Sequence, residues 1–255
     1  MKFVGVDLAW SERNASGLAV LSGNKEKAEL ILAKIGTSDQ EILDFIKEGT
    51  KEDKAFISID APLIVPNKTG RRVAEEITGK LFRKFNAGAH PANRTRLSSF
   101  TGSIRGEVIS KKLEKQGYEH NPKTKKFENS NKFFEVYPHP SIVVLFKLDK
   151  ILQYKAKPKR DYNFRYKEFK KYQSYLKGLE KAETKLVLPK KITNLDVTKL
   201  RGKKLKNYED LLDGVFCAYL SYYIWKNPEK CAILGNFKKG YILTPIFEYQ
   251  KELLK

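Results

Sequence analysis

Two aspartates, Asp7 and Asp60, interrupt apolar segments of the chain. Asp7 lies in KFVGVDLAW and Asp60 in AFISIDAPL, and both segments have the composition of buried strands. Burying an ionised carboxylate is costly, so each aspartate must be protonated, paired with Lys or Arg, or bound to a cation. For either residue alone, an ordinary ion pair is the simpler explanation. If the strands are parallel neighbours, however, both carboxylates lie at the carboxyl edge of the sheet, where α/β proteins bind ligands.

Three further acids could join this pair. Glu135 lies in the strand-like segment FFEVYP, where a solvated position is an equally good explanation. Asp210 and Asp213 are three residues apart and therefore share one face of a predicted helix. Asp210 has an alternative role at the positive end of the helix dipole, whereas Asp213 lies a turn deeper in an apolar stretch and ranks above it.

Adjacent carboxylates repel one another unless a cation lies between them, and oxygen ligands suit Mg²⁺ or Mn²⁺. Two such ions about 4 Å apart would activate a water and stabilise both oxygens of a phosphodiester displacement. We expect Asp7 to bridge the ions, Asp60 and Asp213 each to complete one, and Glu135 to bind or orient the water. No Ser/His/Asp order competes, and Cys217 lies in an apolar helical stretch typical of a core residue.

The first sixty residues predict the elements that bring the two aspartates together. A polar turn joins the first strand to a second and favours a hairpin, and a third strand follows. Ser38 and Glu41 then form a capping box before a short helix that leads to the strand of Asp60. A helix between two buried strands indicates a parallel crossover, hence a mixed sheet with a helical face. The strands are expected within residues 2–10, 17–23, 28–36 and 55–63.

The remaining elements are less uniform. The segment SIVVLFKL at 141–148 fits a strand or a helix equally well. Other segments have a clearer periodicity: helices are predicted at 71–85, 163–181 and 208–225, the last begun by Asn207, and strands at 132–141 and 240–245, the last closing the domain.

The net charge of +20 is concentrated in two segments. Residues 68–126 hold 15 Lys and Arg against 5 Asp and Glu, and residues 147–206 hold 20 against 6. Such segments suit a polyanion and would offset its repulsion from an acidic centre. Arg71, Arg72 and Lys155 are the predicted phosphate contacts. The aromatic residues of DYNFRYKEFKKYQSY could stack on unpaired bases, although packing in the core explains Phe169 and Tyr172 better.

An ordered set of short motifs resembles a known family. GVDLAWSERNASGLAV, SIDAPL, FEVYPHPS, the pair Tyr154-Lys155, DLLDGVFCAY and GYILTP together resemble the domain-of-unknown-function 429 family of predicted ribonuclease H-like nucleases. The resemblance spans nearly the whole chain and is weakest across the basic segments. It implies a ribonuclease H-like α/β fold, in which a mixed five-stranded sheet is flanked by helices and carries the basic insertions. It also implies metal-binding acids at Asp7, Asp60, Asp210 or Asp213, and Glu135. Gly214 departs from the expected alanine.

We therefore predict a single domain over residues 1–255 that hydrolyses phosphodiester bonds of RNA or DNA with Mg²⁺ or Mn²⁺. One alternative is a non-catalytic nucleic-acid-binding protein with the same fold. Another is an actin-like phosphotransferase, which is disfavoured because no glycine-rich phosphate turn follows the first strand before Gly17, so no nucleotide cofactor is expected. Neither a membrane-spanning stretch nor a signal peptide is evident, which predicts a cytoplasmic protein. The two cysteines and three histidines lack zinc spacing.

Overall fold

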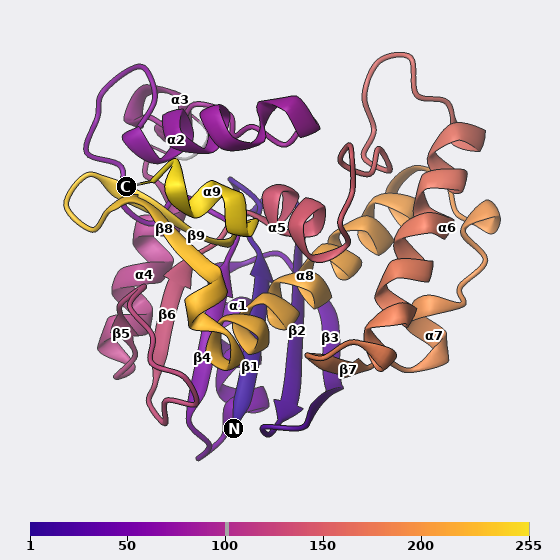
Figure 1. Ribbon diagram of the computed structural model, residues 1–255, viewed down its shortest axis with the longest axis horizontal. Coiled ribbons are helices and arrows are strands. Elements are labelled where there is room, and N and C mark those ends of the chain that lie inside the picture. The colour runs from indigo at the N-terminus through magenta and orange to yellow at the C-terminus, as the bar shows by residue number, and fades with distance from the viewer. Residues whose placement is uncertain (100–101, 255) are drawn as a thin grey trace.

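A computed structural model of the chain describes residues 1–99 and 102–254. Its centre is a mixed sheet in which the strands follow the order β5-β6-β4-β1-β2-β3-β7 (Figure 1). The seven strands are β1 (Lys2–Asp7), β2 (Ser16–Gly23), β3 (Lys27–Gly36), β4 (Ala55–Ile59), β5 (Glu119–His120), β6 (Lys132–Glu135) and β7 (Lys185–Val187). The sheet thus exceeds the predicted five strands by the short edge strands β5 and β7.

Strands β1, β2 and β3 form an antiparallel meander, whereas β4 lies parallel to β1 and β6 parallel to β4. The connection from β3 to β4 is helix α1 (Asp39–Thr50), and Ser38 and Glu41 form the predicted capping box at its start. The parallel register aligns Val6 with Ile59. The predicted hairpin, crossover and mixed sheet are therefore confirmed.

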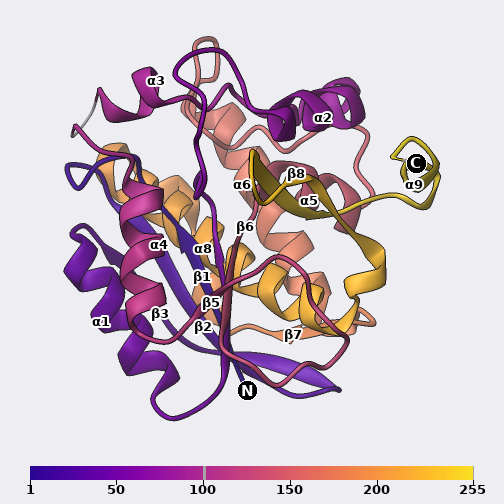
Figure 2. The same ribbon diagram turned by 90° about the vertical axis from the view of Figure 1, so that its left-hand side faces the viewer.

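Two layers of helices cover the sheet. Helices α1 and α4 (Arg105–Lys115) pack on one face, and the long helix α8 (Gly202–Lys226) packs on the other (Figure 2). Helix α8 begins with Arg201 as N-cap, six residues before the predicted start at Asn207. Cys217, on this helix, is fully buried, as expected for a core residue.

Glycines let α8 lie at backbone contact with the β1–β2 hairpin. A Cβ atom added at Gly17 would lie 1.6 Å from the carbonyl oxygen of Asp210. One added at Gly214 would lie 2.5 Å from the carbonyl carbon of Gly17, and one at Gly5 would lie 2.2 Å from the oxygen of Gly214. The departure from alanine at position 214 therefore has a steric reason, because a methyl group there would push the helix off the sheet.

The segment 141–148, left open by its periodicity, lies largely in helix α5 (Pro138–Leu145). The strand predicted at 240–245 exists as β9 (Gly240–Pro245), but it does not close the main sheet. It pairs with β8 (Cys231–Asn236) in a separate two-stranded sheet, as Figure 1 shows. A single bridge between Val136 and Leu243 links this hairpin to the end of β6 among the described residues.

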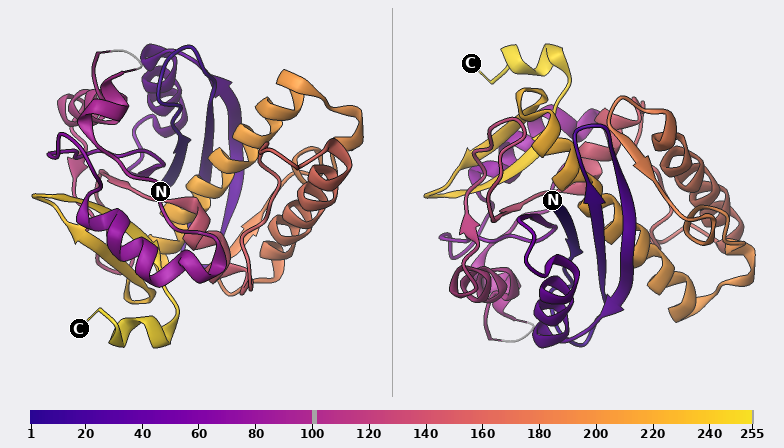
Figure 3. Two further views of the ribbon diagram at one scale, coloured as in Figure 1. Left: turned by 90° about the horizontal axis from the view of Figure 1, so that it is seen from above. Right: turned by 90° about the horizontal axis from the view of Figure 1, so that it is seen from below.

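The two basic segments contribute mostly helices and loops. In the view from above in Figure 3, the helical residues 162–193 of the second segment lie to one side of the sheet. Phe169 and Tyr172 on the second segment are fully buried, which confirms that they are core residues. None of the helices in the described ranges has the length and apolarity needed to span a bilayer. The remaining helices are α2 (Val73–Phe82), α3 (Arg94–Ser98), α6 (Tyr162–Gly178), α7 (Lys190–Thr193) and α9 (Glu248–Glu252), with 3₁₀ turns at Arg83–Phe85, Leu179–Lys181, Val197–Lys199 and Pro228–Lys230.

The contact between α8 and the hairpin gives a first prediction. Gly214→Ala inserts a methyl group against the backbone of Gly17, so we expect a loss of about 1–3 kcal/mol in the free energy of unfolding, measured with urea. Gly178→Ala, in the last turn of α6, is the control, because a Cβ there meets no atom within 4 Å. Equal stability of the Gly214→Ala variant and the wild type would contradict the steric reason.

Candidate functional site

Asp7 and Asp60 lie side by side at the carboxyl edge of the sheet. Asp7 is the last residue of β1, and Asp60 directly follows the parallel neighbour β4. The amide of Asp60 donates a hydrogen bond to the carbonyl oxygen of Val6 at 2.8 Å, which fixes the two backbones together. Within residues 1–99 and 102–254, neither carboxylate has a hydrogen bond or a direct ion pair. The two acids are therefore neighbours, as predicted, and among the described residues no cationic side chain contacts either carboxylate directly.

Lys155 supplies the positive charge nearest to the pair. Its Nζ atom forms an ion pair with Oδ2 of Asp213 at 2.8 Å. The hydroxyl of Tyr154 donates to Oδ1 of the same aspartate at 2.6 Å. Asp213 is thus fully engaged by the neighbouring residues Tyr154 and Lys155 and is only 1% exposed.

Burial dominates the electrostatics of the pair. Although both carboxylates are partly exposed, desolvation raises the pKa of Asp7 well above its ordinary value and raises that of Asp60 from 3.8 to about 7. The ammonium group of Lys155 opposes both shifts, whereas the charge of Asp213 adds to them. Burial disfavours the charge of Lys155, but Asp213, Asp7 and Asp60 together hold its pKa well above the usual range. One lysine is therefore shared electrostatically among three acids.

Glu135 has a different environment from the one predicted. Its Oε1 and Oε2 atoms accept hydrogen bonds from Nη2 and Nη1 of Arg72 at 2.5 and 3.0 Å, and Oε2 also accepts one from the amide of Leu63 at 2.9 Å. Arg72 additionally pairs with Glu75 and is only 3% exposed. Glu135 therefore anchors the chain just after Asp60. The phosphate contact predicted for Arg72 does not fit this buried position.

Asp210 lines the same cavity as Asp7, and its charge contributes to the raised pKa of Asp7. Its Oδ1 atom is 2.5 Å from Nζ of Lys206, and its Oδ2 atom is buried without a hydrogen bond. Burial raises the pKa of Asp210, and Lys206 opposes that shift. Asp210 and Asp7 line the same cavity, whereas Asp213 lies beneath Lys155.

The donor set can now be compared with what a divalent cation requires. Among the residues that the structure describes, no group of three or more His, Cys, Asp or Glu side chains is arranged to hold a metal ion. Asp7 and Asp60 remain as two adjacent carboxylates without hydrogen bonds. This pair fits Mg²⁺ or Mn²⁺, since Mg²⁺ is commonly held by one or two carboxylates, with waters and substrate phosphates as its other ligands.

Three cavities meet around the acids, and we name each for its setting. The α8 groove, of about 650 Å³, contains Asp7, Asp210 and Lys155. The basic pocket, of about 530 Å³, contains Lys155 and Arg71. The Asp60 pocket, of about 100 Å³, lies between them. Trp10, Tyr137 and His90 line the Asp60 pocket, and sequence reasoning missed all three. Trp10 lies three residues after Asp7 and Tyr137 two residues after Glu135, whereas no predicted site residue lies beside His90 in the sequence.

The comparison with protein-family models decides the family. A model described as a protein of unknown function (DUF429) matches residues 5–237. The chain belongs to the DUF429 family. The match includes every predicted site residue from Asp7 to Asp213, so the site lies within the matched range. No curated protein and no solved structure matches the chain significantly.

The raised pKa of Asp60 predicts how stability changes with pH. Between its unfolded value of 3.8 and its folded value of about 7, the folded protein holds a proton that the unfolded chain releases. Asp60 therefore lowers the stability of the wild type as pH rises through this window, and Asp60→Asn removes this contribution. We expect the variant to melt a few degrees above the wild type at pH 8 and to lose this advantage at pH 4.

Thermal unfolding at several pH values measures this difference. Asp149→Asn is the control, because the Asp149 side chain is exposed and lines none of the three cavities named above. A difference between Asp60→Asn and wild type that stays constant from pH 4 to 8 would contradict the assignment.

Proposed function

We propose that this protein is a Mg²⁺- or Mn²⁺-dependent nuclease of the ribonuclease H-like superfamily that hydrolyses phosphodiester bonds. The observation that carries the proposal is the pair Asp7 and Asp60, two carboxylates without partners at the ends of adjacent parallel strands. An acid pair in a cleft with raised pKa values is typical of a functional site. The Lys and Arg side chains of the α8 groove and of the basic pocket suit a polyanionic substrate.

The strand order supports the fold assignment. The five central strands, β3-β2-β1-β4-β6, combine an antiparallel meander with two parallel strands. This combination supports the mixed five-stranded arrangement that the family resemblance implies, to which β5 and β7 would be additions at the edges. The acids lie at the carboxyl ends of β1 and β4, where the resemblance expects them.

The residues of this chain have distinct roles in the proposed reaction. Asp7 and Asp60 would hold the cation, which when bound lowers the pKa of a water and offsets charge on the phosphate. Lys155 would provide a fixed positive charge for the same phosphate. Asp213 holds the ammonium group of Lys155 in place, and Tyr154 donates a hydrogen bond to Asp213. Glu135, through Leu63, positions the chain that carries Asp60.

A two-ion arrangement stays a prediction. A second ion on Asp213 would compete with Lys155, and one on Asp210 would compete with Lys206. One cation together with Lys155 accounts for the charges present. A non-catalytic nucleic-acid-binding protein is the second candidate, favoured by the same Lys155, which partly neutralises the acids without metal. An actin-like phosphotransferase is less well supported, since the β1–β2 turn at 8–15 contains no glycine.

Cleavage assays test the proposal directly. With Mg²⁺ or Mn²⁺, the wild type should cut at least one of labelled single-stranded RNA, single-stranded DNA, hybrid and junction substrates. Asp7→Asn and Asp60→Asn should each lower the rate by at least about a hundredfold, because each removes half of the cation site. Asp149→Asn should cleave like the wild type. Equal cleavage by all four proteins would assign the activity to a contaminant.

Metal binding can be measured separately from cleavage. We expect millimolar Mn²⁺ or Mg²⁺ to raise the melting temperature of the wild type at pH 8, because a ligand that binds only the folded state stabilises it. The same ions should leave Asp60→Asn unchanged. Stabilisation of both proteins to the same extent would exclude the Asp7–Asp60 pair as the binding site and favour the non-catalytic candidate.

A further inference from the structure

The charged side chains that line the basic pocket are all positive. Its lining includes five Lys and Arg side chains and, among the described residues, no Asp or Glu: the five are Arg71, Arg83, Lys155, Lys157 and Arg160. The α8 groove and the Asp60 pocket, in contrast, each contain carboxylates. The charge of the basic pocket is therefore not balanced within the pocket itself.

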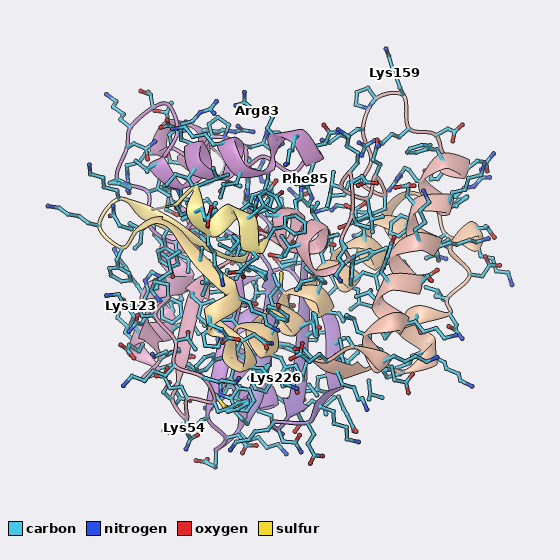
Figure 4. All side chains as sticks on the ribbon, in the orientation of Figure 1. Lys54, Arg83, Phe85, Lys123, Lys159 and Lys226 are labelled. Atoms are coloured by element: carbon cyan, nitrogen blue, oxygen red, sulfur yellow. The ribbon has the colours of Figure 1, made fainter. Side chains whose placement is uncertain are left out.

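Two segments far apart in the sequence build the pocket. Arg71 and Arg83 flank helix α2, and Lys155, Lys157 and Arg160 belong to the loop between α5 and α6. Arg83 and the loop that carries Lys159 lie at the same end of the molecule, opposite Lys54 (Figure 4). Arg160 donates hydrogen bonds to the carbonyl oxygens of Gln153 and Lys155, which fixes the loop.

Three of these cations are available to a ligand. Arg71, Arg83 and Lys157 are exposed, and no ion pair within the described part of the chain engages them. Arg72 and Arg105, by comparison, are buried against carboxylates and hold the fold. Like charges gathered without counterions repel one another, and a bound polyanion relieves that repulsion.

The pocket is continuous with the acids. Lys155 lines both the basic pocket and the α8 groove, which contains Asp7. Tyr137 and His90 line both the basic pocket and the Asp60 pocket. A chain of phosphates that enters the basic pocket therefore reaches the acid pair and can continue into the α8 groove. There Arg13, Lys203 and Lys206 provide further cations.

We propose that the basic pocket holds backbone phosphates of a single-stranded nucleic acid on one side of the acid pair, while the α8 groove holds the strand on the other side. Binding of the strand in this pocket does not require nuclease activity, whereas cleavage of the bound strand rests on the proposed function. A volume of about 530 Å³ corresponds to a cube of roughly 8 Å on a side, less than the separation of about 12 Å between the two backbones across a major groove, so the pocket suits one backbone at a time.

Binding without cleavage tests this proposal. Fluorescence anisotropy with a labelled single-stranded oligonucleotide, in the presence of chelator, compares the wild type with two triple variants of equal charge. The pocket variant is Arg71→Gln/Arg83→Gln/Lys157→Gln. The control variant is Lys54→Gln/Lys123→Gln/Lys238→Gln, whose lysines lie outside the three cavities around the acids. All six side chains are exposed, so both variants are expected to fold.

We expect the pocket variant to bind at least about tenfold more weakly and its salt dependence to fall by about two, since each phosphate contact contributes about 0.7 on single strands. The control should bind within about twofold of the wild type. Equal weakening in both variants would overturn the proposal in favour of non-specific attraction. Equal or tighter binding of a duplex of the same length would overturn it as well. So would competition by a millimolar mononucleotide that is as effective as the strand.

The binding and cleavage assays fail independently. Loss of binding in the pocket variant without any cleavage by the wild type would support the single-strand path and reject the nuclease. Cleavage that depends on Asp60, together with unchanged binding in the pocket variant, would support the nuclease and reject the path.

Discussion

The site depends on the backbone contact between α8 and the β1–β2 hairpin. Gly17 and Gly214 remove the side chains that would hold the two elements apart, so the helix rests directly on the strands. Ser221 Oγ donates to the carbonyl oxygen of Val4, and Ser58 Oγ donates to that of Cys217, which lock the helix along the sheet. Because the helix lies so close, its acids reach the edge at which β1 and β4 end. A helix at an ordinary packing distance would hold Asp210 and Asp213 farther from Asp7 and Asp60.

Charge compensation then divides the acids into two classes. Glu135 and Asp213 each have a nearby cation, Arg72 and Lys155, whereas Asp7 and Asp60 have none in direct contact. Both of those cations come from the basic segments, so these segments do more than give the surface its charge. Arg72 anchors the chain after Asp60, and Lys155 stands between the acids and the basic pocket. The insertions therefore complete the site as well as flank it.

The sequence predicted what depends on local pattern. Apolar runs located the strands of Asp7 and Asp60, and the crossover helix between them predicted that they are parallel neighbours. It could not predict the pairing of Arg72 with Glu135, because 63 residues separate them and no periodicity connects the two segments. The need for glycine at position 214 was equally unpredictable, because it comes from contact with the backbone of Gly17, almost two hundred residues away in the sequence. Strand β9 was recognised by its composition, but its partner β8 depends on tertiary placement.

The acid pair also lowers the stability of the folded state at neutral pH. Burial raises the pKa of Asp60 to about 7, so ionising it at neutral pH opposes folding, and an uncharged amide of similar shape would remove that cost. Lys155 reduces the cost but does not cancel it, because its closest contact is Asp213. Groups that destabilise a fold in this way are typically retained at sites that bind or react. In the proposed reaction, a divalent cation whose other ligands are water and phosphate would match the remaining negative charge on Asp7 and Asp60. The cations of the basic pocket would then attract that phosphate.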